Sequence, residues 1–156
     1  MNTTIITKAT INKAIKNEIQ KRLSRGDIYQ EIQMMLARME DEMVSLLDGA
    51  GETLESNLKR IISAGGKRLR PILAYLCYRM GGGRETDILP LMCMLELMHT
   101  VSLIHDDVVD NAPLRRGQPT INSTCGISAA VRSGDFLLAK SMEYLHVYRG
   151  TGINEV

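Results

Sequence analysis

Three aspartates stand close together in the stretch LIHDDVVDNAPLRRG, from Leu103 to Gly117. On a helix, which turns about 100° per residue, Asp106 and Asp110 project from nearly the same face, and His99 lies within about 20° of that line. Like charges four residues apart and anions at a helix C-terminus are unfavourable. Mg²⁺ would compensate, since it prefers one or two carboxylates together with phosphate oxygens. A hydrated helix end is the alternative interpretation.

Basic residues form two further clusters, one on each side of the aspartates in the sequence. In SAGGKRLRP, Lys67, Arg68 and Arg70 stand at the expected start of a helix, where free backbone N–H groups also attract an anion. Arg115 and Arg116 follow the aspartates, and a planar guanidinium suits phosphate oxygens. Hydrated basic turns are the alternative. Taken with the acidic cluster, the two basic clusters favour a substrate with a charged diphosphate head, a long apolar tail and a second charged partner.

The elements that must position these residues are helices. Apolar spacing predicts five of them, over residues 28–47, 54–62, 69–80, 86–107 and 127–148. The fourth, which starts at Thr86 or Asp87 and carries the aspartates, is apolar on nearly every face and should be central and buried. A loop with Pro and Gly should occupy residues 111–126, and no alternation typical of a strand is present. We therefore predict an all-α helical bundle.

Apolar residues recur at every fourth position near the N-terminus, at Ile11, Ile15, Ile19 and Leu23. Lysines stand between them, so we expect a basic amphipathic segment over residues 1–26 that Gly26 ends. Such a segment either packs as an ordinary helix or makes a peripheral contact with a membrane surface.

Composition narrows the class of protein. The 156 residues include 19 basic and 18 acidic ones, a formal charge of +1, which disfavours a general nucleic-acid binder. Cys77, Cys93 and Cys125 form no CxxC pair, which predicts reduced, mostly packed thiols and neither a disulfide framework nor a zinc site. No run approaches the roughly 20 apolar residues that span a bilayer. We expect a soluble, cytoplasmic protein without a transmembrane segment.

Four motifs resemble those of the trans-isoprenyl diphosphate synthases, or polyprenyl synthetases: GGKRLRP, ELMHTVSLIHDDVVD, NAPLRRGQPT and SGDFLLAKS. The resemblance implies a partial polyprenyl synthetase domain over residues 27–156, with an all-α fold of the isoprenoid-synthase type. It also implies a prenyltransferase that condenses isopentenyl diphosphate head-to-tail with an allylic diphosphate, with Mg²⁺ as cofactor. The partner would be a second copy or another subunit.

The resemblance further implies a role for each matching residue. Asp106 and Asp110, with Asp107 beside them, would hold Mg²⁺ against the allylic diphosphate, and Arg115 would contact that diphosphate. The residues that would bind isopentenyl diphosphate are Lys67, Arg70, His99 and Arg116. Those expected to act in catalysis are Asp106, Asp107, Asp110, Lys67 and Arg115. Metal-assisted loss of diphosphate would leave an allylic carbocation, which the isopentenyl double bond attacks before a proton leaves.

Product length follows from residues just before the aspartates. In the family, bulky aromatic residues there close the pocket early, whereas Val101 and Ser102 are small. The resemblance thus implies a medium or long polyprenyl product, of the heptaprenyl or quinone side-chain kind. The alternative is that Ser102 permits close helix packing.

The chain departs from the family at its end, because GTGINEV is reached without a second aspartate-rich motif. We therefore expect only the N-terminal half of the synthase fold, as a fragment with impaired activity alone. A non-catalytic subunit of a heteromeric synthase is the main alternative. A class I terpene cyclase also uses a DDxxD site, but it consumes one diphosphate and would not need GGKRLRP.

Overall fold

The computed structural model describes residues 25–83 and 85–148, so nearly all of the expected basic amphipathic segment lies outside the described residues. The chain divides into two compact units, residues 1–34 and 35–156. Helix α2 (Arg25–Ser45) supplies the described part of the first unit, where Tyr29 and Met34 are exposed. Gly26 lies in the first turn of α2, whereas the sequence predicted that this residue ends the preceding segment.

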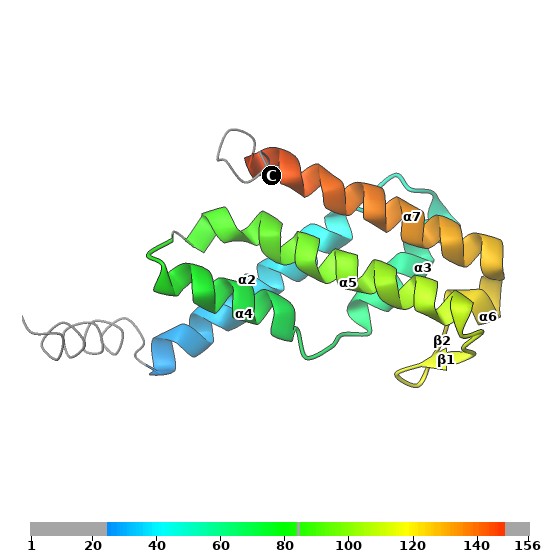
Figure 1. Ribbon diagram of the computed structural model, residues 1–156, viewed down its shortest axis with the longest axis horizontal. Helices are drawn as coiled ribbons and strands as arrows, with labels where there is room; N and C mark the ends of the chain where they lie inside the picture. Colours follow the sequence, from blue (N-terminus) through cyan, green and yellow to red (C-terminus); the bar gives the residue numbers. More distant parts are fainter. Residues whose placement is uncertain (1–24, 84, 149–156) are drawn as a thin grey trace, which may run out of the picture. The chain divides into compact units, whose positions relative to one another are not determined.

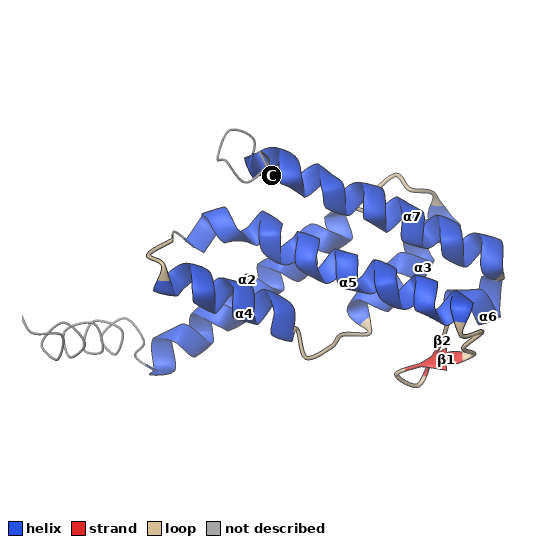
Figure 2. Cartoon of the chain, in the orientation of Figure 1, coloured by secondary structure: helices blue, strands red, loops and turns tan. Residues whose placement is uncertain are grey.

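The second unit contains the remaining helices. After the last turns of α2 they are α3 (Glu52–Ser63), α4 (Leu69–Met80), α5 (Leu89–Val109), α6 (Ile121–Cys125) and α7 (Ile127–Glu143), with short 3₁₀ helices η1 (Glu85–Ile88) and η2 (Tyr144–Tyr148). Figure 2 shows how little of the described chain is strand. The predicted all-α class is confirmed.

Helix α5 is central, as its apolar sequence predicted. It packs against α4, α6 and α7, and Figure 1 shows it running between α4 and α7. Its buried apolar side chains include Met92, Leu97 and Ile104. The approach of α7 is close, because a Cβ added to Gly134 would lie 2.2 Å from Nε2 of His105. A larger residue at this position would have to displace the His105 ring.

The predicted loop over residues 111–126 contains regular structure. Strands β1 (Leu114–Arg115) and β2 (Gln118–Pro119) pair antiparallel as a short hairpin, and α6 follows. The hydroxyl of Thr120 caps α6 by accepting a hydrogen bond from the backbone N–H of Ser123 at 3.1 Å. Two-residue strands are too short to show an alternating pattern, which explains why the sequence did not indicate them.

Two helix ends also differ from expectation. η1 occupies the predicted start of the fourth helix, so Ile88 and neither Thr86 nor Asp87 is the N-cap of α5. The last helix ends at Glu143 and continues as η2. Apolar periodicity alone does not distinguish an α-helix from a short 3₁₀ extension.

The three thiols are free, but they are not all packed. Cys93 is buried, and burial raises the pKa of its thiol to about 12. Cys77 and Cys125 are exposed, so the expectation of packed thiols is wrong for these two.

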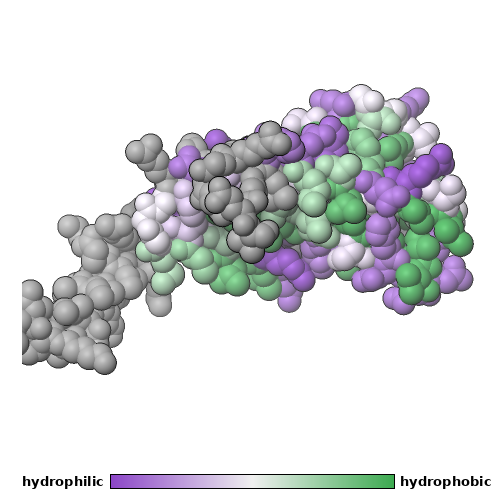
Figure 3. All heavy atoms as spheres, turned by 45° about the horizontal axis from the view of Figure 1, so that its top comes forward, coloured by the Kyte–Doolittle hydropathy of each residue, from purple (hydrophilic) through white to green (hydrophobic). Residues whose placement is uncertain are grey.

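The surface also carries large apolar side chains, and on the face in Figure 3 apolar areas lie among hydrophilic ones. Among the described helices, none combines the length and apolarity needed to cross a membrane.

Candidate active site

Four predicted ligands of isopentenyl diphosphate surround one pocket. Lys67 comes from the turn before α4, Arg70 from the first turn of α4, His99 from α5, and Arg116 from the hairpin. The lining also includes Gly66, Arg68, Leu69 and Glu96. Lys67 and Arg70 are exposed, and neither forms an ion pair with a described side chain. The fold therefore brings cations from two segments that are distant in the sequence together with the His99 ring.

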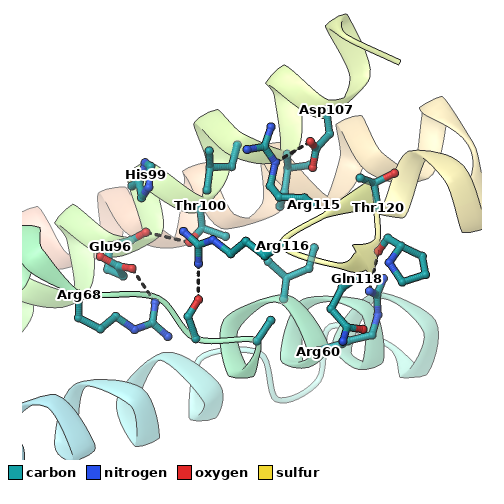
Figure 4. A pocket seen from close by; sticks show the side chains of 16 residues that line it. Arg60, Arg68, Glu96, His99, Thr100, Asp107, Arg115, Arg116, Gln118 and Thr120 are labelled. Carbon is teal, nitrogen blue, oxygen red and sulfur yellow. Dashed lines mark hydrogen bonds and ion pairs between the residues drawn. The ribbon is translucent and has the colours of Figure 1, made fainter. Parts of the chain in front are cut away.

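Glycines shape one wall of this pocket. A Cβ added to Gly66 would lie 2.8 Å from Nη1 of Arg116, so a larger residue there would require that guanidinium to shift. Arg116 donates a hydrogen bond to the carbonyl oxygen of Gly65. Figure 4 shows Arg116 reaching from the hairpin toward the turn before α4, across a second pocket that lies between α3, α5 and the hairpin.

Arg68 has a different environment from Lys67 and Arg70. Its side chain is buried, and it donates hydrogen bonds from Nη1 to Glu96 at 2.6 Å, from Nε to Glu40 at 3.1 Å and from Nη2 to the carbonyl oxygen of Ile62 at 2.7 Å. Its backbone is left-handed, with φ 47°. Three of the five N–H donors of Arg68 are therefore engaged inside the protein, whereas the sequence grouped this residue with Lys67 and Arg70 in the anion site.

Glu96 is the site residue that sequence reasoning missed. It lies on α5 one turn before His99, is buried, and lines both pockets. A signal was present, because an acidic residue on a buried apolar helix needs a partner. That partner is Arg68 (Figure 4).

The aspartates divide in the same way as the basic residues. Asp106 and Asp110 are exposed at the C-terminal end of α5, and no ion pair joins either of them to a described side chain. Asp107 is buried and accepts a hydrogen bond from Nε of Arg115 at 2.6 Å.

Within residues 25–83 and 85–148, no cluster of three or more His, Cys, Asp or Glu side chains could hold a metal ion. Two neighbouring carboxylates still fit Mg²⁺, which takes its other oxygens from water and phosphate.

The pKa of the His99 imidazole is lowered, first by burial and then by the charge of Arg70. Arg116 and Arg115 act in the same direction, and Glu96 opposes them. The lowered pKa favours the neutral form of the ring, which offers one N–H donor.

Val101 and Ser102, the two residues expected to set product length, differ in their exposure. Val101 is buried in the helix packing, whereas Ser102 is exposed and its hydroxyl donates to the carbonyl oxygen of His99 at 2.8 Å. This exposure does not support the alternative that Ser102 permits close packing among the described helices.

Comparison with known proteins gives matches over most of the chain. Residues 51–156 match the family described as Polyprenyl synthetase. Solanesyl diphosphate synthase 2, chloroplastic, of Arabidopsis thaliana is 34% identical over 142 residues, which cover 87% of this chain and 34% of that protein. The chain spans about a third of the length of this curated relative.

Solved structures share the fold. The heptaprenyl diphosphate synthase of Staphylococcus aureus matches with a TM-score of 0.72 and 27% identity, over 79% of this chain and 39% of that one. A polyprenyl synthase from Caulobacter crescentus, solved in complex with calcium and isoprenyl diphosphate, matches with a TM-score of 0.71 and 27% identity, over 82% of this chain and 37% of that one. The family match over residues 51–156 and the shared helical fold agree, and the chain belongs to the polyprenyl synthetase family.

Proposed function

We propose that this chain supplies the diphosphate-binding surfaces of a trans-polyprenyl diphosphate synthase, which condenses isopentenyl diphosphate head-to-tail with an allylic diphosphate. The observation that carries the proposal is the convergence of Lys67, Arg70, His99 and Arg116 around one pocket. The names of its relatives, and the isoprenyl diphosphate in the Caulobacter crescentus structure, support it.

Isopentenyl diphosphate would bind in the cationic pocket. Lys67 and Arg70 are exposed and available to phosphate oxygens, and the neutral ring of His99 can donate one hydrogen bond. Arg116 would exchange the carbonyl of Gly65 for a phosphate oxygen, which is the stronger, charge-assisted acceptor. The diphosphate would thereby hold the isopentenyl double bond in a fixed position.

The allylic diphosphate would bind at the acidic end of α5. Asp106 and Asp110 would hold Mg²⁺, which when bound neutralises charge on the departing diphosphate. Asp107 fixes Arg115 through Nε, which leaves the two terminal nitrogens of that guanidinium for phosphate oxygens. Arg115 would stabilise the diphosphate as it leaves with the electron pair of the C–O bond. The isopentenyl double bond then attacks the allylic carbon, and a proton is lost.

Two finer expectations stay predictions. A medium or long product rests on the small side chains of Val101 and Ser102. A cytoplasmic location is also untested, since the name of the Arabidopsis relative includes the word chloroplastic.

A second candidate function is that of one subunit in a heteromeric synthase. The exposed side chains of Leu69, Leu73 and Met80 favour it, because each is at least 63% exposed and helical spacing places them near one face of α4. An apolar face of this kind is typical of contacts with another chain. Complex formation with a stoichiometric partner distinguishes this candidate from a self-sufficient enzyme.

The test of the proposed function is incubation of the chain with Mg²⁺, farnesyl diphosphate and labelled isopentenyl diphosphate, followed by sizing of prenyl products. We expect elongated product from the chain as it is or together with its partner. The Lys67→Ala variant should lose it, and Lys140→Ala, which alters a lysine on α7 that pairs with Glu143, should retain it. Equal product from both variants would contradict the proposed role of the pocket.

A further inference from the structure

A buried ion pair forms part of the wall of the cationic pocket. The side chains of Arg68 and Glu96 are 7% and 6% exposed, and Nη1 of Arg68 lies 2.6 Å from Oε1 of Glu96. Both residues line the pocket together with Lys67, Arg70 and Arg116 (Figure 4 shows the pair). Neither residue of this pair has a role in the proposed function.

Stability alone does not explain the pair. Removing two charges from water costs about as much as their attraction returns, so an apolar pair would serve the core equally well. The position of Glu96 is also unexpected, because a carboxylate beside an anion-binding site repels the anion. The charge of Glu96 reaches the site, since it acts on the His99 imidazole against Arg70 and Arg116.

We propose that Arg68 masks the negative charge of Glu96, so that Lys67, Arg70 and Arg116 remain available to the diphosphate. This inference rests on the proposed function of the pocket. Arg68 acts through Glu96 and does not contact the substrate.

The geometry of Arg68 suits masking rather than ligand binding. Its three nitrogens are directed at three different acceptors, which are Glu96, Glu40 and the carbonyl oxygen of Ile62. Three of its five N–H donors are thereby engaged with acceptors inside the protein, which holds the guanidinium against Glu96. The backbone of Arg68 is left-handed and its side chain is buried, although its neighbour Lys67 is exposed.

Four variants separate a charge effect from a geometric one: Arg68→Met, Arg68→Lys, Glu96→Gln and the double variant Arg68→Met/Glu96→Gln. Isothermal titration of each with inorganic pyrophosphate gives the dissociation constant. Arg68→Met exposes the pocket cations to an unmasked carboxylate, and we expect binding about tenfold weaker than in the parent chain. Arg68→Lys keeps the charge without the three-way contact, and its binding should stay within about threefold of the parent.

The double variant is the decisive comparison. Because Glu96→Gln removes the charge that needs masking, Arg68→Met/Glu96→Gln should recover most of the affinity that Arg68→Met loses. Glu96→Gln alone should bind pyrophosphate at least as tightly as the parent chain. A purely structural pair predicts the opposite, with each variant losing thermal stability and the double variant binding no better than Arg68→Met.

Either of two results would overturn the inference: equal weakening by Arg68→Lys and Arg68→Met, or weaker binding by Glu96→Gln. If Arg68→Met fails to fold by circular dichroism, Glu96→Gln alone still decides the question, since it keeps the side-chain shape. The Lys67→Ala variant tests the proposed function separately. If it binds pyrophosphate as tightly as the parent chain, the binding site is not the cationic pocket. If Lys67→Ala weakens pyrophosphate binding and Arg68→Met does not, the proposed function stands and only the masking by Arg68 is refuted.

Discussion

The basic turn before α4 and the acidic end of α5 each contain two neighbouring residues of like charge, of which one is exposed and the other is buried in an ion pair. In the turn, Lys67 is exposed and Arg68 is buried against Glu96. At the helix end, Asp106 is exposed and Asp107 is buried against Arg115. Each motif therefore pairs an exposed, charged side chain with a buried neighbour that forms an ion pair. The two regions differ in which charge is exposed, and together they suit a metal-bound diphosphate and a second diphosphate.

The exposed members of the two motifs should carry binding. We expect Asp106→Asn to weaken Mg²⁺-dependent binding of farnesyl diphosphate by about a hundredfold, because one of two metal-binding carboxylates is lost. Binding of pyrophosphate without Mg²⁺ should not change. Asp41→Asn, which alters an exposed aspartate on α2, is the matched control. Equal effects of the two variants on titrations with and without Mg²⁺ would remove Asp106 from the site.

The buried members should carry stability. Asp107→Asn leaves Arg115 without its carboxylate, and we expect a loss of about 2 kcal/mol in the free energy of unfolding. Asp106→Asn should change this free energy by less than about 0.5 kcal/mol, because the residue is exposed. Urea denaturation of both variants measures the difference. Equal losses would show that the division between exposed and buried aspartates has no energetic meaning.

The glycine wall gives a smaller effect. Gly66→Ala places a methyl group against the guanidinium of Arg116, which must shift. We expect isopentenyl diphosphate to bind about fivefold more weakly, with little change in the stability of the chain. Titration of Gly66→Ala beside Gly117→Ala, which has open space around its Cβ but a positive φ, separates crowding at the pocket from backbone strain. A larger loss of affinity in Gly117→Ala would rule out the crowding explanation.

The smallest expected effect concerns His99, whose pKa is lowered in the free chain. A bound diphosphate favours the imidazolium and raises this pKa, so binding should take up a fraction of a proton between the two values. Affinity should then rise as pH falls through this window and level off below the lowered pKa. Titrations in two buffers of different ionisation enthalpy measure the uptake. His99→Asn should reduce it, and an unchanged uptake would assign the proton to the diphosphate itself.

Much of the fold could be predicted from the sequence, because apolar periodicity follows directly from packing. The helix over residues 69–80 was predicted with the bounds that the structure gives to α4. The central position of α5 followed from its apolar faces. The short hairpin and the 3₁₀ turn η1 were missed, since a few residues of irregular structure leave no periodic signal.

Residue type did not predict which charged side chains of the candidate site are buried. Residue type suggested anion or metal binding for Arg68 and Asp107, just as it did for Lys67 and Asp106. Their separation depends on the direction of each side chain, which a left-handed backbone sets at Arg68 and the helical turn sets at Asp107. Glu96 could have been found by asking which basic residue neutralises an acidic one on a buried helix.

The central claim is that the pocket of Lys67, Arg70, His99 and Arg116 binds a diphosphate. Titration of the chain with isopentenyl diphosphate, followed by isothermal calorimetry, tests it most directly. We predict saturable binding to one site that Lys67→Ala weakens by at least tenfold and Lys140→Ala leaves intact. Saturable binding that is the same in both variants would place the diphosphate elsewhere and contradict the account.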